Sequence, residues 1–426
     1  MQNNYDEIIA ELYTFMRAGT KPGLERIKIL LGLLGNPETK IKAIHVAGTN
    51  GKGSVCNMLA SILQEAGLVV GLYTSPHISK FNERIRVNGK EISDQEIVDI
   101  LNTFFKDAKR INATFFEITT ALAIDYFRKS KVDIAIIETG MGGSWDSTNI
   151  VKPILSIITQ IDLDHQDFLG ETLQEIALEK AGIMKPRVPT LIADTHPELK
   201  ELFIKHAKKN NTPIAFIENW INSSNVTIDE DLNVICDIED GFFTYKQMIL
   251  PVAGLHQVQN LKAIIAAYNN LKFKYPLDEE TIKKGLLNLK QNTGFSSRIE
   301  LVSKDPKIIV DVAHNPAGIM RLVETIQLSP FANQKFDIYF AAMHDKDIRA
   351  MLGQLKPICE NLNIIQLANE RAARIAELSE IAQGLGYASI NTFDAPEKAF
   401  EKITADSIIC GSFYTVEAFT NGMKNI

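Results

Sequence analysis

The sequence predicts an α/β protein with two domains, and two observations support this prediction. Strand-like apolar runs alternate with helix-patterned segments along most of the 426 residues, which is typical of sheets built from parallel strands. This alternation is interrupted by the polar residues 290–297 and then starts again. We therefore expect a first domain over residues 1–296 and a smaller second domain over residues 297–426.

The order of elements near the N-terminus indicates a parallel sheet. Residues 41–47 predict a strand, residues 55–66 a helix and residues 68–74 a second strand, and strands joined by a crossover helix lie parallel. Further strands are expected at residues 132–138, 154–160, 307–312, 336–342, 362–367 and 407–410, with shorter strands and turns within 217–249. Helices are expected at residues 6–35, 117–129, 171–184 and 257–271.

Composition narrows the class of protein. The formal net charge of -7 argues against a dedicated nucleic-acid binder, which usually presents a basic face, so no nucleic-acid partner is expected. The four cysteines are too few for a disulfide framework and are not spaced as a zinc site. Asp6, Glu7 and Glu11 stand where a signal peptide would be apolar, and no apolar run approaches about 18 residues. We expect a cytoplasmic monomer that does not bind membranes.

A glycine-rich turn follows the first predicted strand and precedes a helix. Glycines let successive backbone N–H groups turn toward an anion, and the helix N-terminus adds a positive dipole end. Lys52 could reach the β- and γ-phosphates of a nucleotide, and Ser54 could bind Mg²⁺. The turn departs from the GxxxxGK[ST] pattern, because Gly53 separates Lys52 from Ser54 and Val46 replaces the first glycine. The alternative is a βα turn without a ligand.

Three polar residues follow predicted strands, where ligands of parallel sheets usually bind. Glu138 ends an apolar strand, and Ser75 and His165 lie just beyond two others. Each has a simpler interpretation: a solvated charge for Glu138, a turn residue for Ser75, and a core or surface histidine for His165. Spacing alone does not decide between these interpretations.

Lys180 shares the apolar stripe of its predicted helix with Leu173, Ile176, Ala177 and Met184. A buried lysine is costly unless it is paired or neutral, and a neutral amine can react with CO₂. The alternative is a lysine whose head group reaches water along the helix surface.

The glycine-rich turn, residues 47–54 (AGTNGKGS), resembles the nucleotide loop of the Mur ligase superfamily. Other segments narrow the resemblance to folylpolyglutamate synthase and the bifunctional dihydrofolate synthase. They occur in family order at residues 73–77 (YTSPH), 81–85 (FNERI), 138–143 (ETGMGG), 179–183 (EKAGI), 311–316 (DVAHNP), 344–347 (HDKD) and 410–413 (CGSF). The resemblance implies a P-loop-type N-terminal ATPase domain with a mostly parallel sheet, followed by a smaller Rossmann-like C-terminal α/β domain.

The resemblance also implies a set of site residues. Lys52, Lys180 and His314 are the expected catalytic residues, with Lys180 carbamylated so that it supports the metal site. ATP is expected to contact Thr49, Asn50, Gly51, Lys52, Gly53, Ser54, Asn260, Arg298 and Asp311. Two Mg²⁺ ions are expected, one at Ser75 and Glu138 and one at His165. The folate-type substrate is expected at Thr114, Phe115, Phe116, Glu117, Trp145, Asp146 and Ser147.

The substrate loops depart from the family pattern. The family commonly has GGRLDATN where this chain has Ser144 and Trp145 after the two glycines, and a DLG sequence where this chain has Lys21, Pro22 and Gly23. Trp145 could stack on a flat ring. The nucleotide-binding residues match the family, so the choice of substrate is the property that these differences affect.

The implied activity is ATP-dependent ligation of L-glutamate to dihydropteroate, to a folate or folylpolyglutamate, or to both. The acceptor carboxylate would form an acyl phosphate, and the second domain would close on ATP and bind glutamate. ADP and phosphate would be released. Two alternatives are a cell-wall Mur ligase acting on a nucleotide-linked peptide and a P-loop regulatory ATPase. The Ser-Pro-His and Phe-Asn-Glu-Arg segments favour the folate enzyme.

Overall fold

The computed structural model describes residues 4–18, 22–77, 80–295 and 299–423. Two of the positions singled out above, Lys21 and Arg298, lie outside these described residues. The chain divides into two compact units. The first comprises Met1–Ser223, Ile238–Tyr245 and Gln259–Phe295, and the second comprises Ser224–Asp237, Lys246–Val258 and Ser296–Ile426.

The first unit is built on a sheet with eight strands among the described residues, in the order β4-β3-β2-β5-β1-β6-β7-β8. Neighbours from β2 to β8 pair in parallel, and only the β2–β3 and β3–β4 pairs at one edge are antiparallel. The mostly parallel sheet expected from the sequence is confirmed. The strands are β1 (Ala43–Ala47), β2 (Val70–Tyr73), β3 (Ile85–Val87), β4 (Lys90–Glu91), β5 (Ile134–Glu138), β6 (Leu155–Ile158), β7 (Thr190–Ile192) and β8 (Ile214–Phe216).

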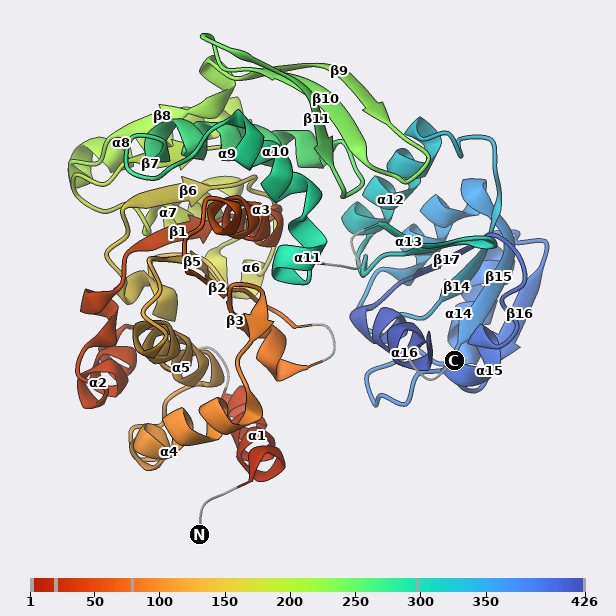
Figure 1. The fold of residues 1–426 in the computed structure, drawn as a ribbon. Helices are drawn as coiled ribbons and strands as arrows, with labels where there is room; N and C mark the ends of the chain where they lie inside the picture. The colour runs from red at the N-terminus through yellow and green to blue at the C-terminus, as the bar shows by residue number, and fades with distance from the viewer. Residues whose placement is uncertain (1–3, 19–21, 78–79, 296–298, 424–426) are drawn as a thin grey trace. The chain divides into compact units, whose positions relative to one another are not determined.

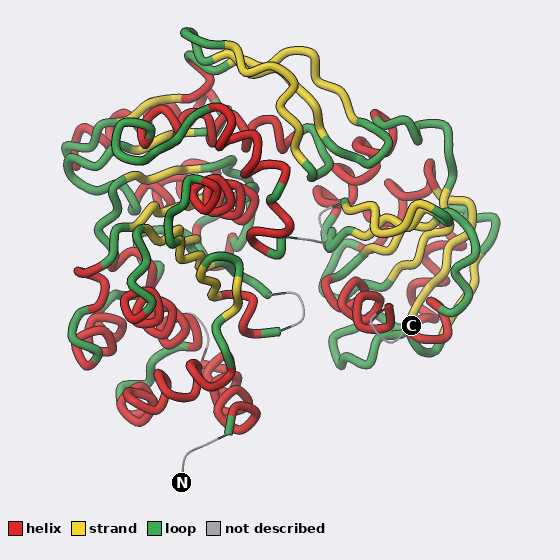
Figure 2. Tube along the Cα trace, viewed as in Figure 1, coloured by secondary structure: helices red, strands yellow, loops and turns green. Residues whose placement is uncertain are grey.

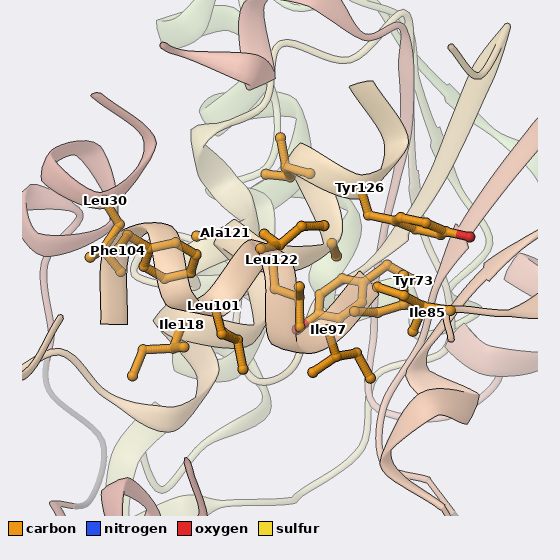
Figure 3. Packing of buried hydrophobic residues seen from close by; sticks show 14 of the residues in the cluster. Leu30, Tyr73, Ile85, Ile97, Leu101, Phe104, Ile118, Ala121, Leu122 and Tyr126 are labelled. Atoms are coloured by element: carbon orange, nitrogen blue, oxygen red, sulfur yellow. The ribbon is translucent and has the colours of Figure 1, made fainter. Parts of the chain in front are cut away.

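Helices flank this sheet, as the ribbon and the tube both show (Figures 1 and 2). Buried side chains of α2, α4 and α5 form one apolar cluster with β2 and β5, and Figure 3 shows Leu30 beside the ring of Phe104 within it. The helices are α1 (Tyr5–Thr14), α2 (Glu25–Leu33), α3 (Lys52–Glu65), α4 (Asp94–Arg110), α5 (Phe115–Lys129), α6 (Gln166–Leu169), α7 (Leu173–Ala181), α8 (Lys200–Asn210), α9 (His256–Leu271), α10 (Glu279–Leu287) and α11 (Leu289–Thr293).

Several of these helices begin where the sequence supplies a cap. The side chains of Ser93, Thr114 and Thr172 each accept a hydrogen bond from the third backbone N–H of α4, α5 and α7. A glutamate at that third position returns the bond to the cap residue in all three helices, which satisfies two otherwise unpaired donors at each helix start. The starts of α5 and α7, which carry predicted site residues, are thus set by residues next to them in the sequence.

A three-stranded sheet, in the order β11-β10-β9, follows the first sheet in the sequence. Its strands, β9 (Asn222–Ile228), β10 (Val234–Glu239) and β11 (Thr244–Leu250), confirm the short strands expected within residues 217–249.

The second unit contains a sheet with six strands in the described part of the chain, in the order β12-β13-β17-β14-β15-β16. Only β12 and β13 pair antiparallel, so this unit is again a mostly parallel α/β fold. Its strands are β12 (Glu300–Lys304), β13 (Lys307–Val310), β14 (Phe336–Phe340), β15 (Cys359–Ile365), β16 (Ile390–Phe393) and β17 (Ser407–Cys410). Its helices are α12 (Pro316–Leu328), α13 (Ile348–Leu355), α14 (Ile375–Gly384), α15 (Pro396–Phe400) and α16 (Phe413–Met423).

The single helix predicted over residues 6–35 is wrong. The structure has α1, a short 3-10 helix (Phe15–Ala18) and then α2, which starts only at Glu25. Pro22 lacks the N–H that a helix interior needs, and Gly23 has φ of 109°, outside the helical region. The apolar periodicity continues across this break because both helices bury side chains in the same cluster. Among the described helices, none is long and apolar enough to cross a membrane.

Candidate active site

The glycine-rich turn joins β1 to α3, and close contacts explain its glycines. A Cβ atom at Gly48 would lie 1.8 Å from Thr159 Oγ1, and one at Gly51 would lie 2.3 Å from Asn260 Oδ1. Gly51 also has φ of 86°, a conformation that favours glycine. The structure therefore brings Asn260, predicted at ATP, directly against the loop.

The backbone amides of this loop are divided between two tasks. Those of Thr49 and Asn50 donate to Gln160 O at 2.8 and 3.1 Å, so they hold the loop against the end of β6. The side chain of Asn50 also donates to the carboxylate of Asp162. The first amides of α3, which begins at Lys52, have no partner within their own helix and are the ones suited to an anion.

Lys52 lies over the loop. Its Nζ donates to the carbonyl oxygens of Gly48 at 3.0 Å and Thr49 at 3.2 Å. The ammonium group is therefore held at the N-terminus of α3, where the helix dipole already favours negative charge.

Glu138 and Ser75 meet because β5 and β2 are neighbouring parallel strands. Glu138 ends β5 and is only 4% exposed, and the backbone N–H of Ser75 donates to its Oε2 at 3.0 Å. A Cβ atom on Gly53 would lie 3.8 and 3.9 Å from the two Glu138 carboxylate oxygens. The carboxylate thus faces the start of α3, next to the buried Ser54.

His165 pairs with Asp164, its neighbour in the sequence. Its ring is about half exposed, and its Nε2 lies 3.6 Å from Asp164 Oδ2. Within the described ranges, no group of three or more His, Cys, Asp or Glu residues is placed to hold a metal ion. The structure therefore brings Ser75 and Glu138 together but does not join His165 to them in one ligand cluster.

Lys180 is buried, with 3% of the residue exposed, in α7. Its Nζ donates to Gly48 O at 2.9 Å, the same carbonyl oxygen that accepts from Lys52. The alternative in which its head group reaches water is therefore excluded. Burial lowers the pKa of Lys180 to about 7, and the charge of Lys52 adds to this shift while nearby carboxylates oppose it. A neutral amine is thus accessible near neutral pH, beside the phosphate loop.

The lowered pKa of Lys180 predicts how stability depends on pH. Between pH 7 and 10.5 the unfolded lysine binds a proton that the folded one does not, so the free energy of unfolding rises with pH across this window. Below about pH 7 the lysine is protonated in both the folded and the unfolded state, so the full cost of burying its charge lowers the free energy of unfolding. The Lys180→Met variant should lose this slope and be more stable than the wild type at pH 7. Urea unfolding of both proteins at pH 7 and 9, in CO₂-free buffer without nucleotide, measures the effect. Identical slopes for both proteins would contradict it.

The predicted substrate loop that carries Trp145 and Asp146, residues 143–149, is hydrogen-bonded to the end of α7. Ser144 N donates to Glu179 O at 2.8 Å, and the Asn149 side chain donates to Ser144 O at 3.2 Å and Gly182 O at 3.1 Å. A Cβ atom on Gly182 would lie 2.2–2.6 Å from atoms of Ser144. The helix end that carries Lys180 and the loop that carries Asp146 therefore form one packed unit.

This packing predicts opposite effects for two glycine substitutions. Gly182→Ala should lower the free energy of unfolding by about 1–3 kcal/mol, because the new methyl group has to displace the backbone of Ser144. Gly32→Ala is the matched control: a Cβ at Gly32 meets nothing within 4 Å, and alanine in a helix should add about 0.5–1 kcal/mol. Denaturant unfolding measures both. Equal effects of the two substitutions would show that the Gly182–Ser144 contact is unimportant.

Asp146 is buried, whereas Trp145 beside it is 59% exposed. Asp146 Oδ2 accepts from Met141 N and Oδ1 accepts from Thr148 N, both at 2.9 Å. Burial raises the pKa of Asp146, and these hydrogen bonds oppose the rise. Ser147 is also buried, as the first residue of the 3-10 helix η4 (Ser147–Ile150). The exposed indole and the anchored carboxylate are suited to a flat ring with polar edges.

The predicted substrate residues of α5 also have structural roles. Thr114 caps the helix, and the Glu117 carboxylate pairs with Arg26 Nε at 3.0 Å. Phe115 stacks on Tyr13 with ring centroids 5.8 Å apart, and the Arg84 guanidinium lies over its face. A Cβ at Gly140 would collide with the ring of Phe116, so this ring packs on the loop after β5. The contacts are compatible with both a core and a binding role.

In the second unit, the predicted residues lie at the end of β13. Asp311 is buried and accepts from Ile299 N and Ala313 N, each at 2.8 Å. His314 Nδ1 lies 3.1 Å from Val312 O, and its ring contacts that of Phe413 at 5.2 Å. Asp311 therefore ties the backbone just before β12 to the turn after β13, and His314 is held in that turn.

Sequence reasoning missed several residues that shape the site. Gln160 and Asp162 hold the phosphate loop, and Thr148 bonds to Asp146. No local pattern marks these roles, because the partners are distant in sequence or are backbone groups. One such residue could have been found from the sequence: His45 is a polar residue in the middle of an otherwise apolar strand.

Comparisons with known proteins agree with this geometry. The model of the Mur ligase middle domain matches residues 46–268, and that of the Mur ligase glutamate ligase domain matches residues 297–410. A dihydrofolate synthase/folylpolyglutamate synthase of Bacillus subtilis is 36% identical over 391 residues, covering 89% of each chain. The chain belongs to this family of Mur ligases. A folylpolyglutamate synthase of Lacticaseibacillus casei is 32% identical and covers 97% of both chains.

Solved structures of family members confirm the fold of this Mur ligase. A Thermotoga maritima folylpolyglutamate synthase superposes with a TM-score of 0.88 at 31% identity, covering 99% of this chain and 96% of the other. Escherichia coli FolC, solved in complex with DHPP and ADP, gives a TM-score of 0.84 at 28% identity, covering 99% and 98%. The expectation of an ATP-dependent ligase with two α/β domains is confirmed.

Proposed function

We propose that this Mur ligase joins L-glutamate to the carboxylate of a pterin-bearing acceptor, dihydropteroate or a folate, using ATP. The observation that supports this most is the convergence of Lys52 and Lys180 on Gly48 O at the start of α3. The names of the relatives supply the acceptor class, since they are dihydrofolate and folylpolyglutamate synthases. The proposed acceptor is a small molecule, and we propose no nucleic-acid partner.

The proposed reaction has two steps. An oxygen of the acceptor carboxylate attacks the γ-phosphorus of ATP, the bond to the bridging oxygen breaks, and ADP leaves. The glutamate amine then attacks the carbonyl carbon of the acyl phosphate, loses a proton, and expels inorganic phosphate as the amide forms. Lys52 and the first amides of α3 stabilise the charge on the transferring phosphoryl group.

The donor set near Lys52 fits a magnesium ion. Glu138 presents a buried carboxylate toward the start of α3 and lies beside Ser75, and Mg²⁺ prefers such hard oxygen donors while keeping several waters. We propose that Ser75 and Glu138 hold one ion, and that carbamylated Lys180 supports a second with His165. Bound Mg²⁺ would neutralise charge on the phosphates.

The second unit is proposed to bind glutamate and to complete the ATP site. Asp311, held by two backbone amides, is proposed to contact ATP, and His314 in the next turn to act in catalysis. Arg298 belongs to the same proposal on family resemblance alone. Closure of this unit would exclude water from the acyl phosphate.

The proposal is tested by supplying ATP, Mg²⁺ and L-glutamate with either dihydropteroate or tetrahydrofolate. We expect ADP release that depends on the acceptor, and a product heavier by one glutamyl residue in mass spectrometry. Amide product with both acceptors would establish two activities in one chain, and product with one would assign it. ATP turnover without amide product from either acceptor would refute the proposal.

A further inference from the structure

A buried histidine connects the phosphate-loop strand to the substrate loop. His45 lies in the middle of β1, is fully buried, and has its Nε2 2.8 Å from Thr148 Oγ1. Alternation along the strand puts His45 on the same face as Ala43 and Ala47. These two alanines belong to the separate apolar clusters formed with α5 and with α7. His45 therefore stands at the junction of the two clusters.

The hydrogen bonds have a defined direction. The hydroxyl of Thr148 donates to Asp146 Oδ1, so its one hydrogen is used and its oxygen faces His45 as an acceptor. Nε2 of His45 must then carry the ring hydrogen. Burial lowers the pKa of His45 to about 3, and Lys185 adds to the shift, so the ring is neutral at physiological pH. The result is a chain of donors from His45 through Thr148 to the Asp146 carboxylate.

Packing alone does not account for His45. Its Nδ1 is buried and has no hydrogen-bond partner among the described residues, and an unsatisfied buried polar atom costs about 1–3 kcal/mol. A leucine would fill a buried strand position without this cost. The destination of the chain, in contrast, is the anchored carboxylate beside the exposed Trp145, in the loop assigned to the acceptor.

We propose that His45 is a positioning residue that orients the Asp146 carboxylate, through Thr148, to bind the polar edge of the acceptor's ring. The proposal rests on the proposed function, because that function supplies the acceptor. A pterin carries N–H donors on one edge, and a carboxylate with a fixed rotamer can accept two of them in parallel. Loss of His45 would remove the donor that fixes the Thr148 hydroxyl and so weaken its bond to Asp146 Oδ1, while Met141 N and Thr148 N still hold the carboxylate.

Two variants separate positioning from packing. His45→Leu removes the donor and the unsatisfied nitrogen together, so its melting temperature should equal or exceed that of the wild type. Its Kd for dihydropteroate or tetrahydrofolate, whichever the wild type binds more tightly by calorimetry, should rise by about tenfold. The Kd for ATP should change less than twofold. His45→Gln, whose amide can still donate to Thr148, should bind the acceptor within about threefold of the wild type.

Thr148→Val should raise the Kd for the acceptor by as much as His45→Leu does. The double variant should bind the acceptor no more weakly than either single variant, because both substitutions break the same chain of hydrogen bonds. The control is Thr190→Val in β7: this buried hydroxyl also has no partner in the described part of the protein, but it lies outside the chain of hydrogen bonds, so acceptor binding should be unchanged. Wild-type acceptor affinity in His45→Leu would overturn the proposal while leaving the ligase function intact. A packing role would be indicated instead if His45→Leu lost acceptor and ATP affinity equally, had a lower melting temperature, and if His45→Gln did not restore either. That result would overturn the proposal.

A spectroscopic test does not depend on ligase activity. In ¹⁵N-histidine-labelled protein, the signal lost in His45→Leu should show a neutral ring with hydrogen on Nε2 down to about pH 5. A ring protonated on Nδ1 would reverse the chain and overturn the proposal. If the wild type binds neither acceptor, the proposed function fails together with this inference, and that result differs from wild-type binding with an unaffected variant.

Discussion

Lys180→Ala is expected to reduce kcat by about 10²–10³-fold, with partial recovery in short carboxylic acids such as acetate or propionate. The lysine is buried, its lowered pKa makes the neutral amine available, and a carbamate formed from it would place an anionic group beside Gly48 and the phosphate loop. Removal of the side chain leaves a space that a small carboxylate can enter. Steady-state rates with and without the added acid measure both effects.

Two outcomes of this experiment would contradict the expectation. Full activity without added acid would refute any role for Lys180. Activity lost at unchanged melting temperature and not restored by any carboxylate would contradict the carbamate and indicate that the amine itself acts. Lys185→Ala is the matched control, since this lysine is also desolvated but donates to Asn149 O, away from the phosphate loop. Carboxylic acids should not change its rate.

The contrast between Lys180 and Ser75 shows what the sequence could predict. The position of Lys180 on an apolar stripe is visible in the sequence, and only the competing water-exposed conformation needed the structure to exclude it. The meeting of Ser75 and Glu138 depends on the order β2-β5-β1, which no local pattern specifies. Family resemblance supplied that pairing, and backbone geometry explains it.

Two other features were not predicted, because contacts between distant parts of the chain decide them. Thr49 and Asn50 are predicted to contact ATP, but the sequence does not show that their backbone amides bond to Gln160 O, a partner more than 100 residues away. The break between α1 and α2 was signalled by Pro22 and Gly23, yet the continuous apolar periodicity favoured one helix. Tertiary contacts decide both cases. The phosphate loop is anchored to Gln160, and α1 and α2 bury side chains in the same apolar cluster.

Lys52→Met should have the second large effect, a fall of about 10²–10³-fold in kcat/KM for ATP. The lysine lies at the N-terminus of α3 and donates hydrogen bonds to the carbonyl oxygens of Gly48 and Thr49. Its loss removes a positive charge that attracts the phosphates while leaving the loop's bonds to Gln160 in place. The melting temperature should therefore change little.

The step that Lys52 assists can be separated from binding. If the ammonium group acts mainly on the transferring phosphoryl group, acyl-phosphate formation in a single turnover should slow more than the Kd for ATP rises. Lys52→Arg keeps the charge on a planar group of different shape, so it should recover part of the rate but not all of it. The control Lys42→Met alters an exposed lysine just before β1 and should leave the rate unchanged. If Lys52→Met kept activity within threefold of the wild type, the α3 amides and the metal would be enough to stabilise the phosphates. Lys52 would then only hold the loop through its bonds to the carbonyl oxygens of Gly48 and Thr49.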